Sequence, residues 1–546
     1  MIATAAYRAA PDSAYLALSS TDGKPLARLS LLSALDRTDG VDETFGVDAV
    51  AEGNEIRIDR RSSIWDRAGA TVQCEPDRIE VRTWVEGVGP LGAVHLLGGR
   101  SIAPGRTGFF PSGTDAKTLF SPSPGDPARL SFRAGEPAVV GVSGDGAPGR
   151  GHWFFTPAPL FFSLDDLGIG VVAPVEELRF VQAEYRPSDR GFHLLLDYEG
   201  HTVVDGRFEA PVVVLRPGVE DPYDGVRQHR EDLDVPARAA DPAAWWREPI
   251  FCGWGAQCYV SSRNGKPASE HATQANYDLF LDELERHGVV PGTVVVDDKW
   301  QDAYGTNEPD GAKWPDLKSW ISARHDRGQH VLLWWKAWDP EGLDPDLCIR
   351  APDGRPVAAD PTNPRTRDLL QESMHALLSA DALDADGLKI DFTAKTPSGA
   401  GLTAYGDSWG IALLHELLAT VYEGAKDAKG DALLITQTPH PGFVDVSDMI
   451  RLNDMLRLDD AGPFPAVVPQ MRHRAAVAHA ACPELLVDTD DWAVPSKTAW
   501  REYLDVKAEL GVPSLYYATH LDVTGEPLDE DDYAALRRVW TEWRAR

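Results

Sequence analysis

Up to about residue 235, apolar and polar residues alternate in short runs that Gly and Pro interrupt. In the run 79–86, Ile79, Val81 and Val85 fall on one face of an extended chain, and charged residues fall on the other. This period of two indicates a half-buried antiparallel strand. Similar runs recur at 55–59, 153–156, 169–173, 193–197 and 212–215, and no amphipathic helix of ten residues is evident before the 230s. The pattern predicts an antiparallel β-sandwich domain over residues 1–235.

From Pro249 onward the period changes, because short apolar runs now alternate with helical patterns. Tyr277, Phe280 and Leu284 follow helical spacing, and Asn363-Pro364 forms a helix start. Eight strand-like runs occur between such helices, at 250–252, 293–296, 330–335, 388–390, 433–435, 449–452, 485–487 and 514–517. Their number and spacing predict an α/β fold, a (β/α)8 TIM barrel over residues 249–546, with 236–248 as the linker. An open doubly wound sheet is the alternative, but no Gly-x-Gly-x-x-Gly follows the first run.

The amino-acid composition limits the classes of molecule that such a protein is expected to bind. The 546 residues carry 85 acidic and 53 basic side chains, a net charge of −32, which disfavours nucleic acid and anionic membranes. The five cysteines show no C-x-x-C spacing, so neither a disulfide framework nor a thiolate metal site is expected. No signal-like start and no run of 18 apolar residues is present. We therefore expect a cytoplasmic protein without metal or cofactor, and leave a homo-oligomer open.

Polar and aromatic residues gather where five of the predicted strands end, which is where a (β/α)8 barrel carries its catalytic groups. The candidates are Asp297, Asp298, Trp300, Trp334, Lys336, Lys389, Asp391, Arg451, Asp454 and Asp490. Tryptophan faces stack on the C–H faces of sugars, while Asp and Lys hydrogen-bond hydroxyls. Any one of these residues could instead cap a helix or fill the core. Their joint placement indicates a carbohydrate site.

The segment Lys389-Ile390-Asp391 is the sharpest of these signals. Residues two apart in a strand point the same way, so Lys389 and Asp391 should both face the barrel interior. An opposite-charge pair there could be purely structural. Carboxylates facing each other across a sugar ring are, however, what glycoside hydrolysis requires.

Asp297-Asp298-Lys299-Trp300, the stretch 313–334 and the Lys389-Ile390-Asp391 segment together resemble a clan of retaining α-glycosidases. That clan contains the family 36 α-galactosidases, the raffinose-synthase-like enzymes and, more distantly, the family 31 α-glucosidases. The order of a β-sandwich before the barrel also resembles family 36. The resemblance covers roughly residues 250–520 at the level of motifs.

The resemblance implies a role for each matching residue. Asp391 corresponds to the catalytic nucleophile and Asp454 to the general acid/base, with Asp459 and Asp460 as alternatives. Sugar-binding positions are expected at Asp297, Asp298, Trp300, Trp334, Lys336, Lys389, Arg451 and Asp490. The implied activity is hydrolysis of terminal α-linked sugars by double displacement, with α-galactosides favoured. The two catalytic carboxyl groups should then lie about 5–5.5 Å apart.

Several alternatives stay open. The chain departs from the usual D-D-G-W of the family, because Lys299 stands where Gly is usual. An α-glucosidase or a transglycosylase of the same clan would use the same residues, and a non-catalytic sugar-binding protein could keep the same fold. A metal-dependent barrel hydrolase would need His-x-His after the first strand, where this chain reads Phe251-Cys252-Gly253-Trp254.

Overall fold

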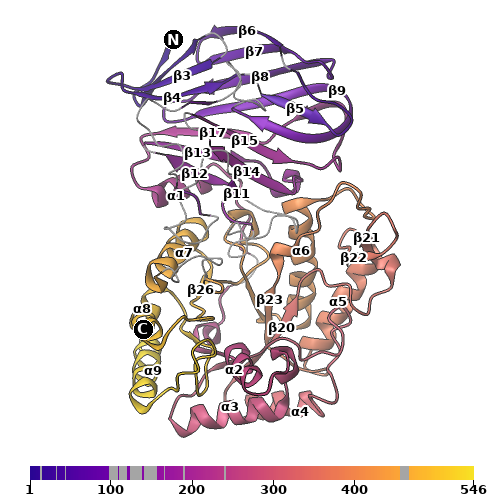
Figure 1. Cartoon of the computed structure of the whole chain (residues 1–546), viewed down its shortest axis with the longest axis vertical. Coiled ribbons are helices and arrows are strands. Elements are labelled where there is room, and N and C mark those ends of the chain that lie inside the picture. The colour runs from indigo at the N-terminus through magenta and orange to yellow at the C-terminus, as the bar shows by residue number, and fades with distance from the viewer. Residues whose placement is uncertain are drawn as a thin grey trace.

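The computed structural model describes residues 1–12, 15–31, 33–43, 45–97, 108–109, 120–122, 138–139, 157–164, 166–187, 191–238, 241–455 and 466–546. An antiparallel β domain occupies one end of the molecule, and a ring of helices around parallel strands occupies the other (Figure 1). The predicted class, a β-sandwich followed by a (β/α)8 barrel, is confirmed. The run predicted at 153–156 lies outside the described residues.

The N-terminal domain consists of two antiparallel sheets that share one long strand, β9 (Ile79–Leu96). The first part of β9 pairs with β8, β16 and β17, and its last part pairs with β5 and β15. Its buried and exposed positions alternate over 79–82, as the period-two pattern predicted. The strands are β1 (Ile2–Ala3), β2 (Tyr7–Asp12), β3 (Tyr15–Ser20), β4 (Pro25–Ser30), β5 (Ala34–Arg37), β6 (Phe45–Glu52), β7 (Glu55–Arg61), β8 (Arg67–Cys74), β10 (Gly108–Phe109), β11 (Ala138–Val139), β12 (Phe161–Leu164), β13 (Leu167–Val172), β14 (Gln182–Pro187), β15 (Gly191–Asp197), β16 (Val203–Glu209) and β17 (Val212–Pro217).

One helix in this half was not predicted. Helix α1 (Pro222–Glu231) begins at the N-cap Asp221, whose side chain accepts from the Tyr223 amide, with Pro222 at the first helical position. It packs against β12, β13 and the barrel helix α7. Only Gly225, Val226 and His229 are buried along it, so its apolar stripe is too narrow to stand out in the sequence.

All eight predicted barrel strands overlap strands of one parallel sheet, in the order β26-β25-β24-β23-β20-β19-β18-β27. A parallel bridge between Asp488 and Val512 brings the two ends of this sheet together. The strands are β18 (Ile250–Cys252), β19 (Thr293–Val296), β20 (His330–Lys336), β23 (Gly387–Asp391), β24 (Leu433–Thr436), β25 (Met449–Arg451), β26 (Leu486–Asp488) and β27 (Ser514–Leu515). Because the strands are parallel, their C-terminal ends meet at one rim of the barrel.

Helices cover the outside of the barrel, and a small hairpin of β21 (Cys348–Arg350) and β22 (Pro356–Ala359) follows β20. The helices are α2 (Trp254–Asn264), α3 (Gln274–Arg286), α4 (Leu317–His325), α5 (Pro364–Leu378), α6 (Gly410–Ala428), α7 (Val467–Ala481), α8 (Lys497–Leu510) and α9 (Glu530–Arg544). Short 3-10 helices are η2 (Val175–Glu177), η3 (Ala244–Arg247), η4 (Ala268–His271), η5 (Pro345–Leu347), η6 (Thr393–Lys395) and η7 (Pro441–Phe443). Among the described residues, no helix combines the length and hydropathy of a membrane span.

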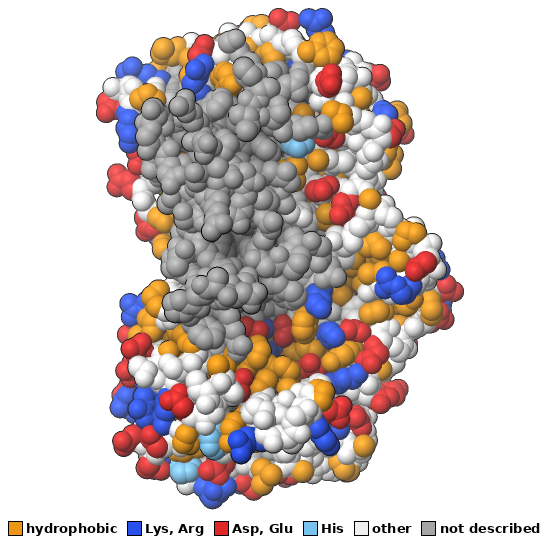
Figure 2. All heavy atoms as spheres, viewed as in Figure 1, with side chains coloured by type: hydrophobic (Ala, Val, Ile, Leu, Met, Phe, Trp, Pro, Cys, Tyr) orange, Lys and Arg blue, Asp and Glu red, His pale blue; other side chains and the backbone are white. Residues whose placement is uncertain are grey.

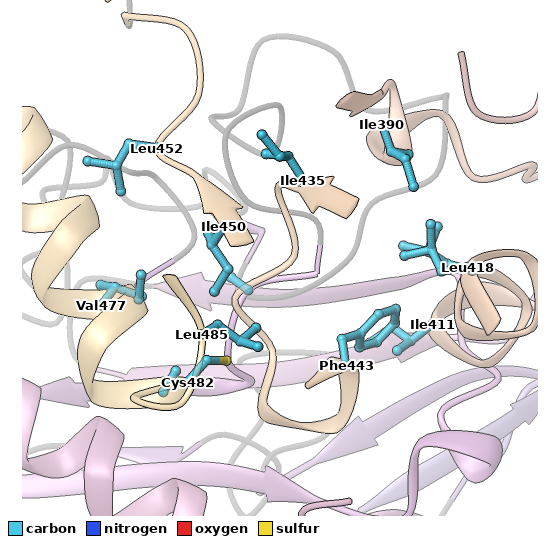
Figure 3. Close-up of a cluster of buried hydrophobic side chains, with 14 of the residues drawn as sticks. Ile390, Ile411, Leu418, Ile435, Phe443, Ile450, Leu452, Val477, Cys482 and Leu485 are labelled. Atoms are coloured by element: carbon cyan, nitrogen blue, oxygen red, sulfur yellow. The ribbon is translucent and has the colours of Figure 1, made fainter. Parts of the chain in front are cut away.

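Between β24 and β25 the described chain forms only the short helix η7, and here the sandwich meets the barrel. Phe443 of η7 is fully buried, and Figure 3 shows its ring beside Ile411 and Leu418 of α6, with sandwich strands passing nearby. At the start of α6, the Ala412 amide donates to the Leu178 carbonyl of the sandwich. A first-turn amide that has no partner within its helix is thus satisfied by the neighbouring domain.

Acidic and basic side chains are interspersed over the described part of the face drawn in Figure 2, and hydrophobic ones gather on the barrel beside the grey atoms. The net charge of −32 is therefore not concentrated in one patch on this part of the surface.

The junction at α6 leaves no room for a side chain at its first residue. Gly410 has a φ of +61°, and a Cβ placed on it would lie 2.0 Å from the Phe180 carbonyl oxygen. We expect Gly410→Ala to lower the free energy of unfolding by about 2–4 kcal/mol, because backbone strain and overpacking add. Urea unfolding followed by circular dichroism measures this. Gly430→Ala, just beyond the other end of α6 in open space, is the matched control, and equal stability of the two variants would contradict the prediction.

Candidate active site

The guanidinium of Arg451, at the end of β25, lies at the centre of the barrel rim, and its side chain is only 1% exposed. Its Nη2 donates to Asp391 Oδ1 at 3.1 Å, and its Nη1 donates to Asp454 Oδ1 at 3.0 Å and Asp490 Oδ2 at 2.7 Å. Burial alone would lower the pKa of Arg451, but the nearby carboxylates, Asp391 first, raise it well above its ordinary value. One buried cation thus connects three of the predicted site carboxylates.

Asp391, at the end of β23, is held by four donors. Besides Arg451, Oδ1 accepts from the Phe392 amide at 2.8 Å and from Gln437 Nε2 at 3.2 Å, and Oδ2 accepts from Trp334 Nε1 at 3.2 Å. Burial would raise the pKa of Asp391, but Arg451 and Lys389 outweigh it and hold that pKa below the usual range. Asp391 is therefore ionised at neutral pH, and its side chain remains 22% exposed.

Asp454 differs from Asp391 in its environment. It lies in the loop after β25, next to Asn453, which adopts a positive φ of 69°. Burial raises the pKa of Asp454 to about 6 against the opposing effect of Arg451, and the charges of Asp490 and Asp391 add to the rise. Its side chain is 42% exposed, so it is open to a bound molecule. The alternatives Asp459 and Asp460 lie outside the described residues.

Asp490 is fully buried and fixes the other side of Arg451. Its Oδ2 also accepts from the Tyr516 hydroxyl at 3.1 Å, and its Oδ1 accepts from the Asp491 and Trp492 amides. Asp490 has no exposed surface and holds Arg451 in place, and its substrate-binding role stays a prediction.

Lys389, which was predicted to face the barrel interior together with Asp391, is paired there with Asp297. Lys389 Nζ donates to Asp297 Oδ2 at 2.7 Å, and the Cys252 thiol donates to the same oxygen at 3.0 Å. Burial alone would lower the pKa of Lys389, but Asp297 outweighs it and raises that pKa. The two side chains are 3% and 2% exposed, so the pair forms the floor beneath the rim.

A second group of predicted residues lies beside this floor. Asp298 Oδ1 accepts from the Tyr304 hydroxyl at 2.7 Å, and burial raises the pKa of Asp298 to about 6. Lys336 Nζ lies 3.9 Å from the centre of the Tyr304 ring and 2.7 Å from Asp339. Lys299, which stands in place of the usual glycine, lies over the same ring at 4.2 Å. Tyr304 thus organises the acidic and basic groups on this side of the rim.

The two predicted tryptophans have different positions. Trp334 is almost fully buried, and its indole N–H reaches Asp391 directly. Trp300 is fully buried and donates to the Trp334 carbonyl at 2.7 Å, so it supports Trp334 from below. Trp300 therefore belongs to the core, which was the structural alternative for a tryptophan at this place.

Three site residues were missed by the sequence analysis: Gln437, Tyr304 and Tyr516. Gln437 follows β24, where the pattern placed a strand end, and this position could have identified it. Tyr516 lies in the predicted run 514–517, directly after β27, so its position could also have identified it, whereas no pattern in the sequence marks Tyr304. Among the described residues, no group of three or more His, Cys, Asp or Glu is arranged to hold a metal ion.

No family model matches this chain, and no curated protein matches its sequence. Solved structures do match. A glycoside hydrolase family 31 sulfoquinovosidase from E. rectale, bound to an aza-sugar inhibitor, aligns with a TM-score of 0.63 at 12% identity, over 98% of this chain and 82% of that one.

Two further matches act on or form cyclic saccharides by their names. The cycloalternan-degrading enzyme from Trueperella pyogenes, in complex with cycloalternan, aligns with a TM-score of 0.53 at 14% identity over 97% of this chain and 71% of that one. The cycloalternan-forming enzyme from Listeria monocytogenes gives 0.54 at 12% over 98%, and this chain spans about half of its length, 54%.

At these identities the likeness establishes the fold alone. The chain shares its sandwich-and-barrel fold with these glycoside-processing enzymes. The sulfoquinovosidase is a family 31 enzyme by its name, and the motifs had placed family 31 as the more distant relative, so the comparison does not support the assignment to family 36 in particular.

The buried Lys389–Asp297 pair yields a stability prediction. Asp297→Ala leaves an unpaired ammonium in the barrel interior, so we expect a loss of about 3–5 kcal/mol in unfolding free energy. The exposed pair Glu285–Arg327 is the control, and Glu285→Ala should cost about 1 kcal/mol or less. Urea unfolding compares the two, and a loss for Asp297→Ala no larger than the control's would contradict a paired floor.

Proposed function

We propose that this protein is a retaining α-glycosidase that hydrolyses terminal α-linked sugars by double displacement. Asp391 is the nucleophile and Asp454 the general acid/base. The observation that carries the proposal is the shared guanidinium of Arg451, which binds both carboxylates through different nitrogens. In this arrangement the pKa of Asp391 is lowered and that of Asp454 is raised to about 6. Two carboxyl groups whose pKa values are displaced in opposite directions are suited to opposite roles.

The reaction follows from these protonation states. Ionised Asp391 attacks the anomeric carbon while Asp454 gives its proton to the departing glycosidic oxygen, which leaves a covalent glycosyl ester on Asp391. Asp454, now ionised, takes a proton from water, and the resulting hydroxide displaces Asp391 from the sugar. Two inversions restore the α configuration, and both carboxyl groups return to their starting states.

Arg451 serves both steps. Its charge keeps Asp391 ionised before the attack, because it lies 3.1 Å from the attacking carboxylate. Once Asp391 is esterified, its negative charge is gone. Arg451 then interacts with Asp454 without competition from the Asp391 carboxylate. This lowers the pKa of Asp454 when it must act as a base.

The identity of the α-linked sugar is the second part of the proposal. The motifs favour an α-galactoside. An α-glucoside is the second candidate, since one structural neighbour, the cycloalternan-degrading enzyme, was solved with isomaltose. A screen of 4-nitrophenyl α-galactoside, α-glucoside, α-xyloside, α-N-acetylgalactosaminide and α-sulfoquinovoside decides between them. Transglycosylation shares the first step and differs only in the acceptor.

Replacement of the two carboxylates separates their roles. With the aryl α-glycoside selected by the screen, Asp391→Ala should lower kcat by about 10³-fold or more. Azide can fill the space of the lost carboxylate and attack the anomeric carbon once, so this variant should yield the β-glycosyl azide. Asp454→Ala still forms the glycosyl ester, because a nitrophenolate leaves without a proton, and azide should then yield the α-glycosyl azide. Nuclear magnetic resonance of the azide products distinguishes them.

Asp282→Asn, on the exposed side of α3, is the control for the azide experiment. The assignment is wrong if Asp391→Ala retains activity close to that of the control, or if the two variants give azides of the same configuration.

The pH dependence of kcat/KM reports the same two groups. Activity should rise as Asp391 loses its proton, below the usual carboxyl range, and fall above about pH 6 as Asp454 loses the proton it must donate. Asp454→Ala should remove the fall above pH 6. Asp298 also has a pKa of about 6, so Asp298→Asn is the matched control. A descending limb that disappears with Asp298→Asn and persists in Asp454→Ala would reverse the assignment.

A further inference from the structure

Two half-buried tryptophans meet at the barrel rim without a role in the scheme above. Trp254 is the first residue of α2, directly after β18, and Trp492 follows β26. Their ring centres lie 5.8 Å apart with the planes at 70°, an edge-to-face contact. Such a pair is rigid and leaves part of each ring surface open.

Trp492 is tied to the acid/base loop through its backbone. Its carbonyl accepts from the amide of Met455, the residue next to Asp454, and its amide donates to Asp490 Oδ1 at 2.9 Å. The other oxygen of Asp490 binds Arg451. The position of the Trp492 ring is therefore fixed relative to the Asp454 carboxyl group. Its indole N–H is anchored to Asp522 Oδ2 at 2.9 Å, which also fixes the ring's rotation.

The strand order places both rings on one side of the site. Asp454 follows β25, Trp492 follows the adjacent β26, and β27 separates β26 from β18, which Trp254 follows. Asp391 ends β23, on the other side of β25. The tryptophans thus lie on the flank of Asp454 that faces away from the nucleophile. In the described part of the chain the Trp254 indole N–H meets no acceptor, so it is free to bind a hydroxyl.

The chemistry of the first step determines which part of the substrate lies on this flank of Asp454. Asp454 delivers its proton to the glycosidic oxygen, so the group that departs with that oxygen must lie beside Asp454. The same place holds the molecule that attacks the glycosyl ester in the second step. An open tryptophan face favours a flat group with apolar C–H or aromatic surface.

We propose that Trp254 and Trp492 form the platform for the leaving group and the acceptor, which are a second pyranose ring or an aryl ring. This inference rests on the proposed function and deepens it. The substrate is then an oligosaccharide or aryl glycoside rather than the glycoside of a small alcohol, and the platform favours transfer to a sugar acceptor at high concentration.

The experiment compares a substrate that has a ring as leaving group with one that has none. The pairs are melibiose with α-galactosyl fluoride, or isomaltose with α-glucosyl fluoride, whichever sugar the aryl-glycoside screen selects. Fluoride makes no stacking contact and departs without Asp454's proton. We expect Trp254→Ala and Trp492→Ala each to lower the ratio of kcat/KM for the disaccharide to that for the fluoride by about tenfold. Trp254→Phe should restore most of that ratio.

Trp543→Ala is the matched control. This half-buried tryptophan of α9 binds the Arg247 carbonyl, before β18, at the opposite end of the barrel from the rim, and its loss should leave the ratio as in the wild type. The alanine rim variants should also reduce the yield of transfer product relative to hydrolysis at high disaccharide concentration.

Each outcome bears on one claim. If the wild type cleaves both substrates and neither rim variant changes the ratio, the platform is refuted while the proposed function stands. An equal fall for both substrates, with no rescue by phenylalanine, would mean that the tryptophans only support the fold, and would also refute the platform. If the wild type cleaves neither substrate of either pair and no aryl glycoside, the proposed function fails and the platform with it.

Discussion

The contact of one buried guanidinium with three carboxylates is the interaction on which the rest of this site depends. Arg451 is enclosed by the barrel, and an unpaired cation there would be strongly destabilising. The fully buried Asp490 accepts from Nη1 of Arg451, which also donates to Asp454, and Nη2 donates to Asp391. Burial acts on both carboxylates, but Arg451 and Lys389 outweigh it at Asp391, whereas the charges of Asp490 and Asp391 add to it at Asp454, so the two pKa values move in opposite directions. The geometry that neutralises the arginine therefore also prepares an anion and an acid side by side.

The fold supplies the positions for this contact. Arg451 ends β25, Asp391 ends β23 and Asp490 follows β26, so three strand ends within a four-strand arc converge on one point. The sandwich then fixes the loop that follows the nucleophile. Glu199 accepts from the Gly399 amide, and the His201 ring stacks on Trp409 with 3.5 Å between ring centres. In the described residues the N-terminal domain thus braces the chain that leads from Asp391 into α6.

The barrel could be predicted from the sequence because buried parallel strands are continuous apolar runs, and all eight runs overlap the observed strands. Helix α1 was missed because its buried stripe is narrow. Within the site, the motifs located Asp391, Arg451 and Asp454, since each follows a recognisable strand. They did not show that the Lys389 and Asp297 side chains are buried beneath the rim, because the exposure of these side chains depends on the loops above them. Tyr304 acts through side-chain contacts that no local pattern encodes, whereas Gln437 directly follows the predicted strand β24 and could have been found by its position. The preference for family 36 over family 31 rested on short motifs, which three-dimensional comparison did not support.

The proposed reaction has Asp391 and Asp454, held by Arg451, cleave the glycoside in two displacements. The configuration of the first-formed sugar tests this most directly. Proton magnetic resonance can follow the anomeric signals from the first turnovers of the preferred aryl α-glycoside, before mutarotation mixes the anomers. With two displacements, the α-anomer appears first and the β-anomer only later. A β-anomer released first would show a single displacement by water and would contradict the proposed reaction.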